Sequence, residues 1–217
     1  PLTTGGELIS LGSTSGTLSN IVDKGNGQYT ATLTSSTQSG QTTITATIGT
    51  QNIVNTATVS FVAGPASPTQ SSISSALKSI VADGASNSLV TITLYDAFDN
   101  PLINGNDNIT LNSDLGNLGV IADNNNGTYS VVLRSGTLTG LSTISGTLNG
   151  IPFAMNETVD FLARPTVTTQ ISNQANPTIG GTLPLVTGVG LQVLLEGTLY
   201  TLGDGHLSLN GADWSLN

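Results

Sequence analysis

The sequence has no cysteine and only four cationic side chains, Lys24, Lys78, Arg134 and Arg164, against thirteen carboxylates. Without cysteine there is no disulfide framework, which mildly favours a bacterial or intracellular origin. Four scattered positive charges cannot neutralise a phosphate backbone, and a net charge of −9 disfavours docking on anionic lipid. We therefore expect no nucleic-acid partner.

Long apolar runs are also missing. No stretch approaches the ~20 residues that a membrane-spanning helix needs, and the first residues lack the charged start and apolar core of a signal peptide. We expect no direct membrane insertion by this segment, and a targeting signal outside it. Aromatic residues make up only 4% of the chain, with Trp214 the single tryptophan. This scarcity disfavours a stacking platform for sugars or bases, and we expect Trp214 to be a core residue.

Catalytic residues are equally scarce. His206 is the only histidine and lies in an Asp-Gly-His-Leu turn, while no Gly-x-Ser-x-Gly nucleophile elbow occurs. Paired carboxylates for glycoside hydrolysis need a pocket that raises the pKa of one of them, and small β-sandwiches rarely enclose such a pocket. We expect a non-enzymatic protein with no catalytic residues and no cofactor.

What the chain does contain is a repeat. The stretch Asp123 to Tyr129 (DNNNGTY) corresponds to Asp23 to Tyr29 (DKGNGQY), and residues 101–164 align with residues 1–64 without a gap at 24 identical positions. The identities fall on turn glycines and on alternate apolar positions, where backbone conformation and core packing constrain sequence. A period of 100 residues therefore defines the module as residues 65–164.

Short β-branched stretches between Gly, Ser and Asn clusters predict an all-β fold. We expect about seven strands in the module, the number typical of an immunoglobulin-like β-sandwich, including one within residues 72–81 and one at 118–121. Their alternation predicts these inward-facing residues: Val90, Ile92, Leu94, Ile109, Leu111, Tyr129, Val131, Leu133, Ile144, Leu148, Val159 and Phe161. Tyr129 should open the third strand from the end, with its hydroxyl capping a nearby turn. A parallel α/β fold would need amphipathic helices, which are absent.

The repeat predicts three domains. Residues 1–64 form an immunoglobulin-like domain without counterparts of residues 65–100, and residues 65–164 form a complete one. A sandwich without its first strands would expose apolar faces and unpaired edges, so we expect the first domain to be N-terminally truncated. Donation of the missing strands by another molecule is the alternative.

Residues 165–217 leave the repeat and predict a third β domain of a different subtype, C-terminally truncated. The segment between Pro165 and Pro177 is expected to hold a connection and a first strand. A hairpin should turn at Glu196-Gly197, and another at Asn210-Gly211, after which Trp214 lies on a strand.

Four polar residues, Asp96, Asp99, Asn100 and Asp107, gather around one predicted loop. Hard oxygen ligands of this kind can hold Ca²⁺, but the spacing of a calcium-binding loop ending in Glu is absent. Asp and Asn also dominate turns because their side chains bond to the local backbone. We favour the turn interpretation, keep calcium as the alternative, and name no metal ligand.

Several of these motifs occur in the order seen in one family: Ala82-Asp83-Gly84, the strand from Val90 to Leu94, Asp99-Asn100-Pro101, Gly127-Thr128-Tyr129 and Ser142-Thr143-Ile144-Ser145. Residues 1 to about 164 resemble the bacterial immunoglobulin-like repeats of the invasin and intimin type. Residues 203–207 (GDGHL) with Trp214-Ser215-Leu216 resemble the immunoglobulin-like repeats of giant bacterial surface adhesins.

The resemblance implies the passenger of an inverse autotransporter, a rod of tandem sandwich domains on the bacterial cell surface. Its anchor would be an outer-membrane β-barrel not in this chain, and its partner a host cell-surface or matrix protein, with self-association between cells as a further option. Intimin and invasin end in a lectin-like tip with a disulfide, which this cysteine-free chain lacks, so their binding residues cannot be transferred. A passive spacer and, less favoured, an accessory carbohydrate-binding module are the alternative functions.

Overall fold

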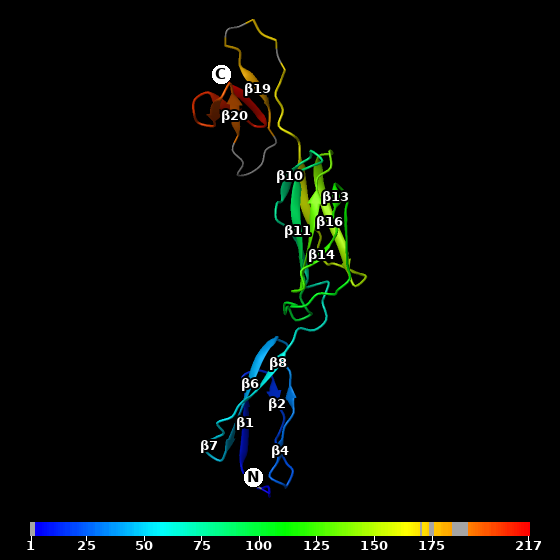
Figure 1. Ribbon diagram of the computed structural model, residues 1–217, viewed down its shortest axis with the longest axis vertical. Helices are drawn as coiled ribbons and strands as arrows, with labels where there is room; N and C mark the ends of the chain where they lie inside the picture. The colour runs from blue at the N-terminus through cyan, green and yellow to red at the C-terminus, as the bar shows by residue number, and fades with distance from the viewer. Residues whose placement is uncertain (1–2, 170, 174–175, 184–190) are drawn as a thin grey trace.

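The computed structural model describes residues 3–169, 171–173, 176–183 and 191–217, and every regular element among them is a β-strand. Figure 1 shows these strands gathered into three bodies in chain order, here called the first unit (residues 3–64), the second unit (65–164) and the third unit (165–217). The predicted all-β class is confirmed. None of the described residues forms a helix long and apolar enough to cross a membrane.

The second unit is a sandwich of two sheets with strand orders β10-β18-β16-β12 and β13-β15-β11-β9. The short strands β17 and β14 pair with β16 and β15, and β10 runs parallel to β18. The bounds are β9 Ser72–Ser75, β10 Ser79–Val81, β11 Asn87–Thr93, β12 Ile109–Ser113, β13 Asn117–Leu118, β14 Ala122–Asp123, β15 Thr128–Arg134, β16 Gly140–Leu148, β17 Ile151–Pro152 and β18 Glu157–Leu162.

The core of the second unit lies between the two sheets where the alternation predicts it. The predicted inward residues are buried, with Ile109 and Leu111 packed at its margin; the buried ones are Val90, Ile92, Leu94, Tyr129, Val131, Leu133, Ile144, Leu148, Val159 and Phe161. Side chains of the two sheets interdigitate because successive residues of a strand point to opposite faces.

A strand is present within residues 72–81, as predicted, and a second one accompanies it. These strands, β9 and β10, join different sheets, because the chain crosses from one sheet to the other between Ser75 and Ser79. The strand predicted at residues 118–121 was wrong, since β13 ends at Leu118 and β14 begins at Ala122. Both short strands pair with β15, one after the other.

The first unit repeats the later part of this architecture. Its main sheet has the order β1-β6-β7 with β8 beside β6, and the pairs β2-β5 and β3-β4 face it. The bounds are β1 Ile9–Ser13, β2 Thr17–Leu18, β3 Val22–Asp23, β4 Tyr29–Thr30, β5 Leu33–Thr34, β6 Gly40–Ile48, β7 Gln51–Asn52 and β8 Ala57–Phe61. Among the described residues of this unit, Thr42 is the one that is buried.

The third unit contains a sheet of order β19-β23-β22 and the hairpin β20-β21. The bounds are β19 Ile179–Thr182, β20 Gln192–Leu195, β21 Thr198–Thr201, β22 Leu207–Asn210 and β23 Asp213–Leu216. Both predicted hairpins are present, and Glu196 and Gly197 adopt the positive φ angles of a tight turn. The strand expected between Pro165 and Pro177 is absent from the described residues of that segment. The first strand of the third unit is β19, which begins at Ile179. Trp214 is buried, as predicted.

Candidate functional site: a polar junction between the first and second units

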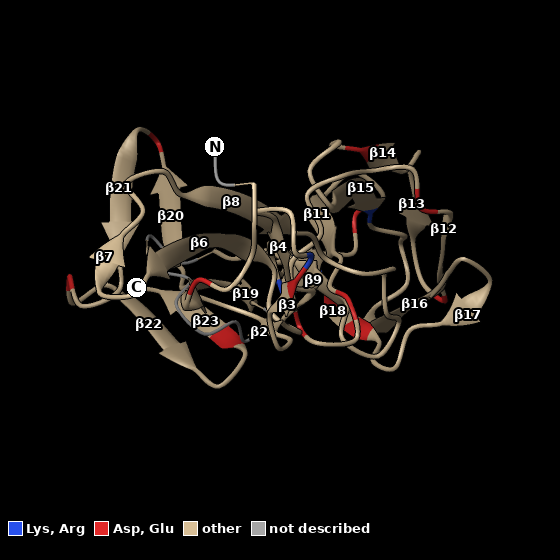
Figure 2. Cartoon of the chain, turned by 90° about the horizontal axis from the view of Figure 1, so that it is seen from below, with Lys and Arg blue, Asp and Glu red and all other residues tan. Residues whose placement is uncertain are grey.

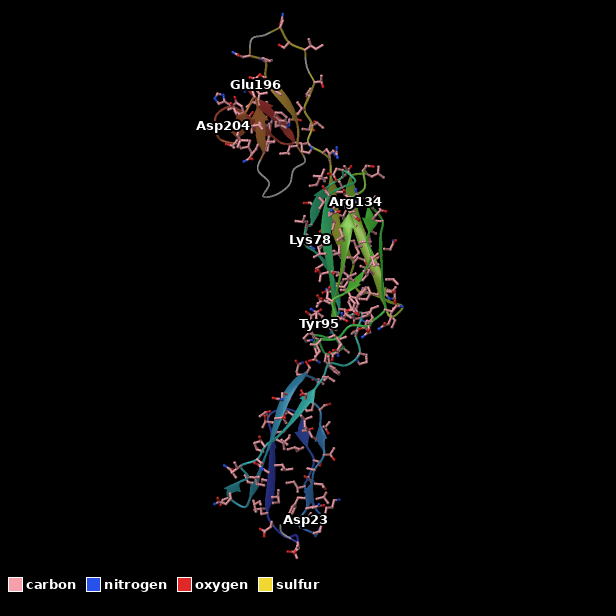
Figure 3. The ribbon with its side chains drawn as sticks, in the orientation of Figure 1. Asp23, Lys78, Tyr95, Arg134, Glu196 and Asp204 are labelled. Carbon is pink, nitrogen blue, oxygen red and sulfur yellow. The ribbon has the colours of Figure 1, made fainter. Side chains whose placement is uncertain are left out.

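A tight turn follows β11 at the end of the second unit that faces the first, close to Tyr95 in Figure 3. Oδ1 of Asp96 accepts the backbone N–H groups of Phe98 at 2.8 Å and Asn100 at 3.0 Å. The backbone N–H of Asp96 donates to the carbonyl of Asn100 at 3.0 Å, and Asp99 between them has a φ of 65°. Asp tolerates this left-handed conformation better than most residues, so the sequence favours this turn locally.

Three hydrogen bonds from this turn reach the first unit. Oδ2 of Asp96 accepts the backbone N–H of Gly64 at 2.8 Å. The side-chain amide of Asn100 forms the other two hydrogen bonds. Its Oδ1 accepts the N–H of Ser39 at 2.8 Å, and its Nδ2 donates to the carbonyl of Thr37 at 2.7 Å. We call Asp96 and Asn100 with these three backbone partners the polar junction.

The two side chains of the polar junction also bind each other, since Nδ2 of Asn100 donates to both carboxylate oxygens of Asp96, at 3.1 and 2.9 Å. Asp96 is 3% exposed and Asn100 is 4% exposed. Burial alone would raise the pKa of Asp96, but the N–H groups of Asn100, Gly64 and Phe98 stabilise the charged form and lower the pKa to about 2. The carboxylate is therefore ionised and fully engaged at neutral pH.

The four candidate calcium ligands do not converge. Asp96 and Asn100 lie together in the polar junction, where both oxygens of Asp96 already accept N–H donors. Asp107 belongs to a different loop, in which its Oδ1 accepts Nδ2 of Asn149 at 2.9 Å. Among the described residues no group of three or more acidic or histidine side chains is placed to hold a metal, and Figure 2 shows the carboxylates spread over many loops and strands. The contacts at Asp96 fit the turn interpretation.

The repeated Asp-to-Tyr stretch forms the same clasp in both units. Oδ2 of Asp123 accepts the N–H of Asn106 at 2.8 Å, and the hydroxyl of Tyr129 accepts the N–H of Asp107 at 2.8 Å. Asp23 and Tyr29 accept from Gly6 and Glu7 in the same way, at 2.7 and 2.8 Å. The prediction that the tyrosine hydroxyl caps a nearby turn is confirmed. The backbone of Gly105 passes so close to Asp123 that a Cβ there would overlap the carboxylate.

His206 lies on an exposed turn, as the sequence indicates. Its backbone N–H donates to Oδ1 of Asp204 at 2.8 Å, and its ring meets the ring of Tyr200 edge-on with centroids 6.0 Å apart. The three residues of the first unit that complete the polar junction, Thr37, Ser39 and Gly64, were missed. Each contributes a backbone atom, and because every residue has such atoms, the sequence gives no signal for them.

The family model described as "Invasin, domain 3" matches residues 1–64 and matches again at residues 67–164, which together exceed half of the chain. The chain belongs to the invasin domain 3 family. The two matches fall on the first and second units and agree with the resemblance inferred from the motifs. The resemblance of residues 165–217 to giant-adhesin repeats stays a prediction.

Two solved structures are similar to this member of the invasin domain 3 family. InvD of Yersinia pseudotuberculosis is 28% identical, with a TM-score of 0.54 over 83% of this chain and 53% of InvD. The Escherichia coli adhesin FdeC is 21% identical, with a TM-score of 0.62 over the whole of this chain and 78% of FdeC, a level that supports the fold alone. The chain thus spans about half the length of InvD.

Proposed function

We propose that this chain is an extracellular segment of a bacterial surface adhesin that attaches the cell to a host cell-surface or matrix protein. The adhesin would be anchored in the outer membrane through a region outside this sequence. The observation that carries the proposal is that two successive units match the invasin domain 3 family. Part-buried hydrogen bonds tie these two units together at the polar junction. Such a joint serves a protein that must project away from a surface.

Membership of the invasin domain 3 family supports this proposal. The chemistry of the units supports it as well. Only 8% of the residues are charged, and strand faces turned outward carry hydroxyl side chains such as Thr91 and Ser130. A broad, weakly charged surface of this kind suits shallow protein–protein contact better than capture of a small molecule.

One apolar pair on such a face is a suitable contact point. Leu89 and Val132 are opposite each other on β11 and β15 and are 48% and 45% exposed. Exposed apolar residues within a polar surround commonly mark interaction sites. We propose that the outer face of the sheet β13-β15-β11-β9 takes part in attachment.

Binding of the 217-residue chain to cultured epithelial cells and to immobilised matrix proteins tests the proposal. We expect saturable binding at micromolar concentration that falls at least ~10-fold in the double variant Leu89→Ser with Val132→Ser, as loss of a central apolar contact does elsewhere. The matched control is Leu141→Ser, which removes an apolar side chain, 60% exposed, from β16 in the opposite sheet and should leave binding unchanged.

A passive spacer that presents a binding tip elsewhere is the second candidate, and the polar junction favours it equally. Absence of binding by the wild-type chain at micromolar concentration would support the spacer and contradict attachment. Binding that survives in the double variant would retain the adhesin function and reject the proposed face.

A further inference from the structure

Strand β10 belongs to the first part of the second unit's chain, β18 is the last strand of that unit, and the two run parallel to each other. The N–H of Asp160 donates to the carbonyl of Lys78, and the N–H of Ala82 donates to the carbonyl of Leu162, both at 2.8 Å. Between these bonds the side chain of Ile80, 5% exposed, belongs to the core. Backbone hydrogen bonds and core packing therefore join the two strands along the whole of β10.

A pull on the chain would load these two strands at opposite ends. The chain enters the second unit at Pro65, on the side of the first unit, and leaves it at Arg164, on the side of the third (Figure 1). The pull therefore reaches β10 through its N-terminal end and β18 through its C-terminal end. Because the strands are parallel, it slides one strand along the other and strains the hydrogen bonds between them together. An antiparallel pair pulled at these two ends would open one bond at a time.

A buried carboxylate joins the start of β18 to the two strands before it. Glu157 is 8% exposed, and its Oε1 accepts the backbone N–H of Ser75 at 3.2 Å. The same oxygen binds the hydroxyl of Ser75 and the ammonium of Lys78. Ser75 ends β9 and Lys78 directly precedes β10, so sliding of β10 along β18 has to break these contacts. Hydrogen bonds to a charged group are stronger than those between neutral groups.

A second side-chain contact lies beyond the other end of β18. Nη2 of Arg164 donates to the carbonyl of Asp83 at 3.4 Å and lies 3.9 Å from Oδ2 of the same residue. Asp83 follows β10 by two residues, and its Oδ1 accepts the N–H groups of Ala85 and Ser86 at 2.8 and 2.6 Å. Arg164 is the last residue of the second unit, so a pull from the third unit reaches this contact first.

Neither side-chain contact is a general feature of the repeat. The first unit has Ala57 and Gly64 at the positions equivalent to Glu157 and Arg164. Neither of these residues has a side-chain group that could form an ion pair or a hydrogen bond. The two contacts therefore distinguish the second unit from the first.

We infer that the second unit contains a mechanical clamp, formed by the parallel pair β10–β18 and the side-chain contacts of Glu157 and Arg164. When the chain is stretched from its two ends, the clamp is loaded by sliding, and the unit stays folded until these hydrogen bonds break together. The inference rests on strand direction and on these contacts rather than on any partner. It applies to an attaching chain and to a spacer alike, and its failure would leave the proposed attachment unaffected.

Single-molecule force spectroscopy in two pulling directions tests the clamp. One chain carries cysteine handles at its two ends, and another carries one at its N-terminus and one at Met155→Cys. Met155 is 76% exposed, and its neighbour Ala154 donates its N–H to the carbonyl of Pro68 at 3.1 Å, so this handle lies where the chain enters the unit. Pulling there opens the β10–β18 pair from one end instead of sliding it. Labelling is specific because the chain has no cysteine of its own.

We expect the second unit to unfold at a force at least ~2-fold higher when the chain is pulled from its two ends, because forced unfolding depends on the barrier along the direction of pulling. Residues 65–164 identify themselves by the length they release, roughly 330–360 Å when fully extended. Equal unfolding forces in the two directions would overturn the inference.

Variants test the side-chain contacts of the clamp. The double variant Glu157→Ala with Arg164→Ala, pulled from the chain ends, should unfold at a force at least ~1.5-fold lower than the wild type, since charge-assisted bonds are lost from the loaded strands. The matched control is Tyr129→Phe, which removes a hydrogen bond to Asp107 outside the clamp. It should lower the urea midpoint and leave the unfolding force unchanged.

Circular dichroism establishes that each variant is folded before it is pulled. A wild-type force in the double variant would overturn the role of the two side chains. An equal fall of the force in Tyr129→Phe would show that the force follows overall stability, which would overturn the clamp. If the double variant does not fold, Arg164→Ala alone takes its place, and the comparison of pulling directions decides independently.

Discussion

The side-chain amide of Asn100 donates a hydrogen bond of 2.7 Å to the backbone carbonyl of Thr37, across the boundary between the first and second units. The oxygen of the same amide accepts the N–H of Ser39 at 2.8 Å, so one side chain satisfies an acceptor and a donor of a single loop. Asn100 is buried whereas Thr37 and Ser39 are exposed, so both bonds are part-buried and water is kept from their Asn100 side. The geometry of the two bonds restricts how the units can rotate about Gly64-Pro65.

Replacement of Asn100 by Ala should loosen this joint without unfolding either unit. Two part-buried hydrogen bonds between the units are lost. A fully buried, unsatisfied backbone group costs about 1–3 kcal/mol, and the cost is lower here because water reaches the exposed Thr37 and Ser39. We expect a broader distance distribution between spin labels at Thr50→Cys and Thr139→Cys, measured by pulsed electron resonance. Labelling is specific because the chain has no cysteine of its own.

The matched control for that experiment is Asn156→Ala, which removes the same side chain from an exposed position in the second unit. It should leave the distance distribution as narrow as in the wild type. An unchanged distribution in Asn100→Ala would show that the linker itself, rather than the amide, sets the orientation.

Acid should also release the joint. The pKa of Asp96 in the folded protein is about 2, below its ordinary value of 3.8. Because the ionised form is favoured when folded, its contribution is present above pH 3.8 and is lost as the pH falls towards 2. The same label pair should therefore report broadening within this interval, while circular dichroism follows the strands. Asp96→Asn should show a broad distribution at pH 7 and no further change of this origin on acidification.

Removal of the Tyr129 hydroxyl should destabilise the second unit. In Tyr129→Phe the N–H of Asp107 loses its acceptor near a side chain that is 3% exposed, which costs about 1–2 kcal/mol. A urea unfolding curve would then move to a lower midpoint with an unchanged slope. Tyr95→Phe is the control, since the hydrogen bonds of Tyr95 described for this structure use its backbone. Equal midpoints for the two variants would contradict the capping role.

Two equivalent valines allow a comparison of core packing within one chain. Val159→Ala deletes fully buried methyl groups and should destabilise the second unit by about 2 kcal/mol. Val59→Ala removes the same groups from a site that is 41% exposed, and its effect on the first unit should stay below about 1 kcal/mol. Residue-resolved hydrogen exchange can measure both. Similar losses at the two sites would indicate that the first unit is closed in solution.

Periodicity predicted the core because burial on one face of a strand imposes a period of two. Val90, Ile92, Val131 and Leu133 are all buried as the alternation requires. The crossing between Ser75 and Ser79 could not be predicted in this way, since a strand that changes sheets keeps the same alternation. The turn at Glu196-Gly197 could be predicted because glycine adopts positive φ angles more readily than other residues, and both residues have positive φ here.

The polar junction was only half visible in the sequence. Asp96 and Asn100 stood out as a polar cluster, but a calcium site, a local turn and a contact between units all use the same residue types. What separates them is the identity of the partner atoms. Here these partners are backbone atoms some 60 positions away along the chain, for which no residue type is diagnostic.

The partners of Asp96 and Asn100 in the first unit are the N–H of Gly64, the N–H of Ser39 and the carbonyl of Thr37. Every residue except proline carries both groups, so the polar junction requires almost no particular side chain in the first unit. The two side chains that the polar junction does require, Asp96 and Asn100, both lie in a single five-residue turn of the second unit. A gene encoding such units could gain, lose or reorder copies, and each new neighbour would still be held at its joint.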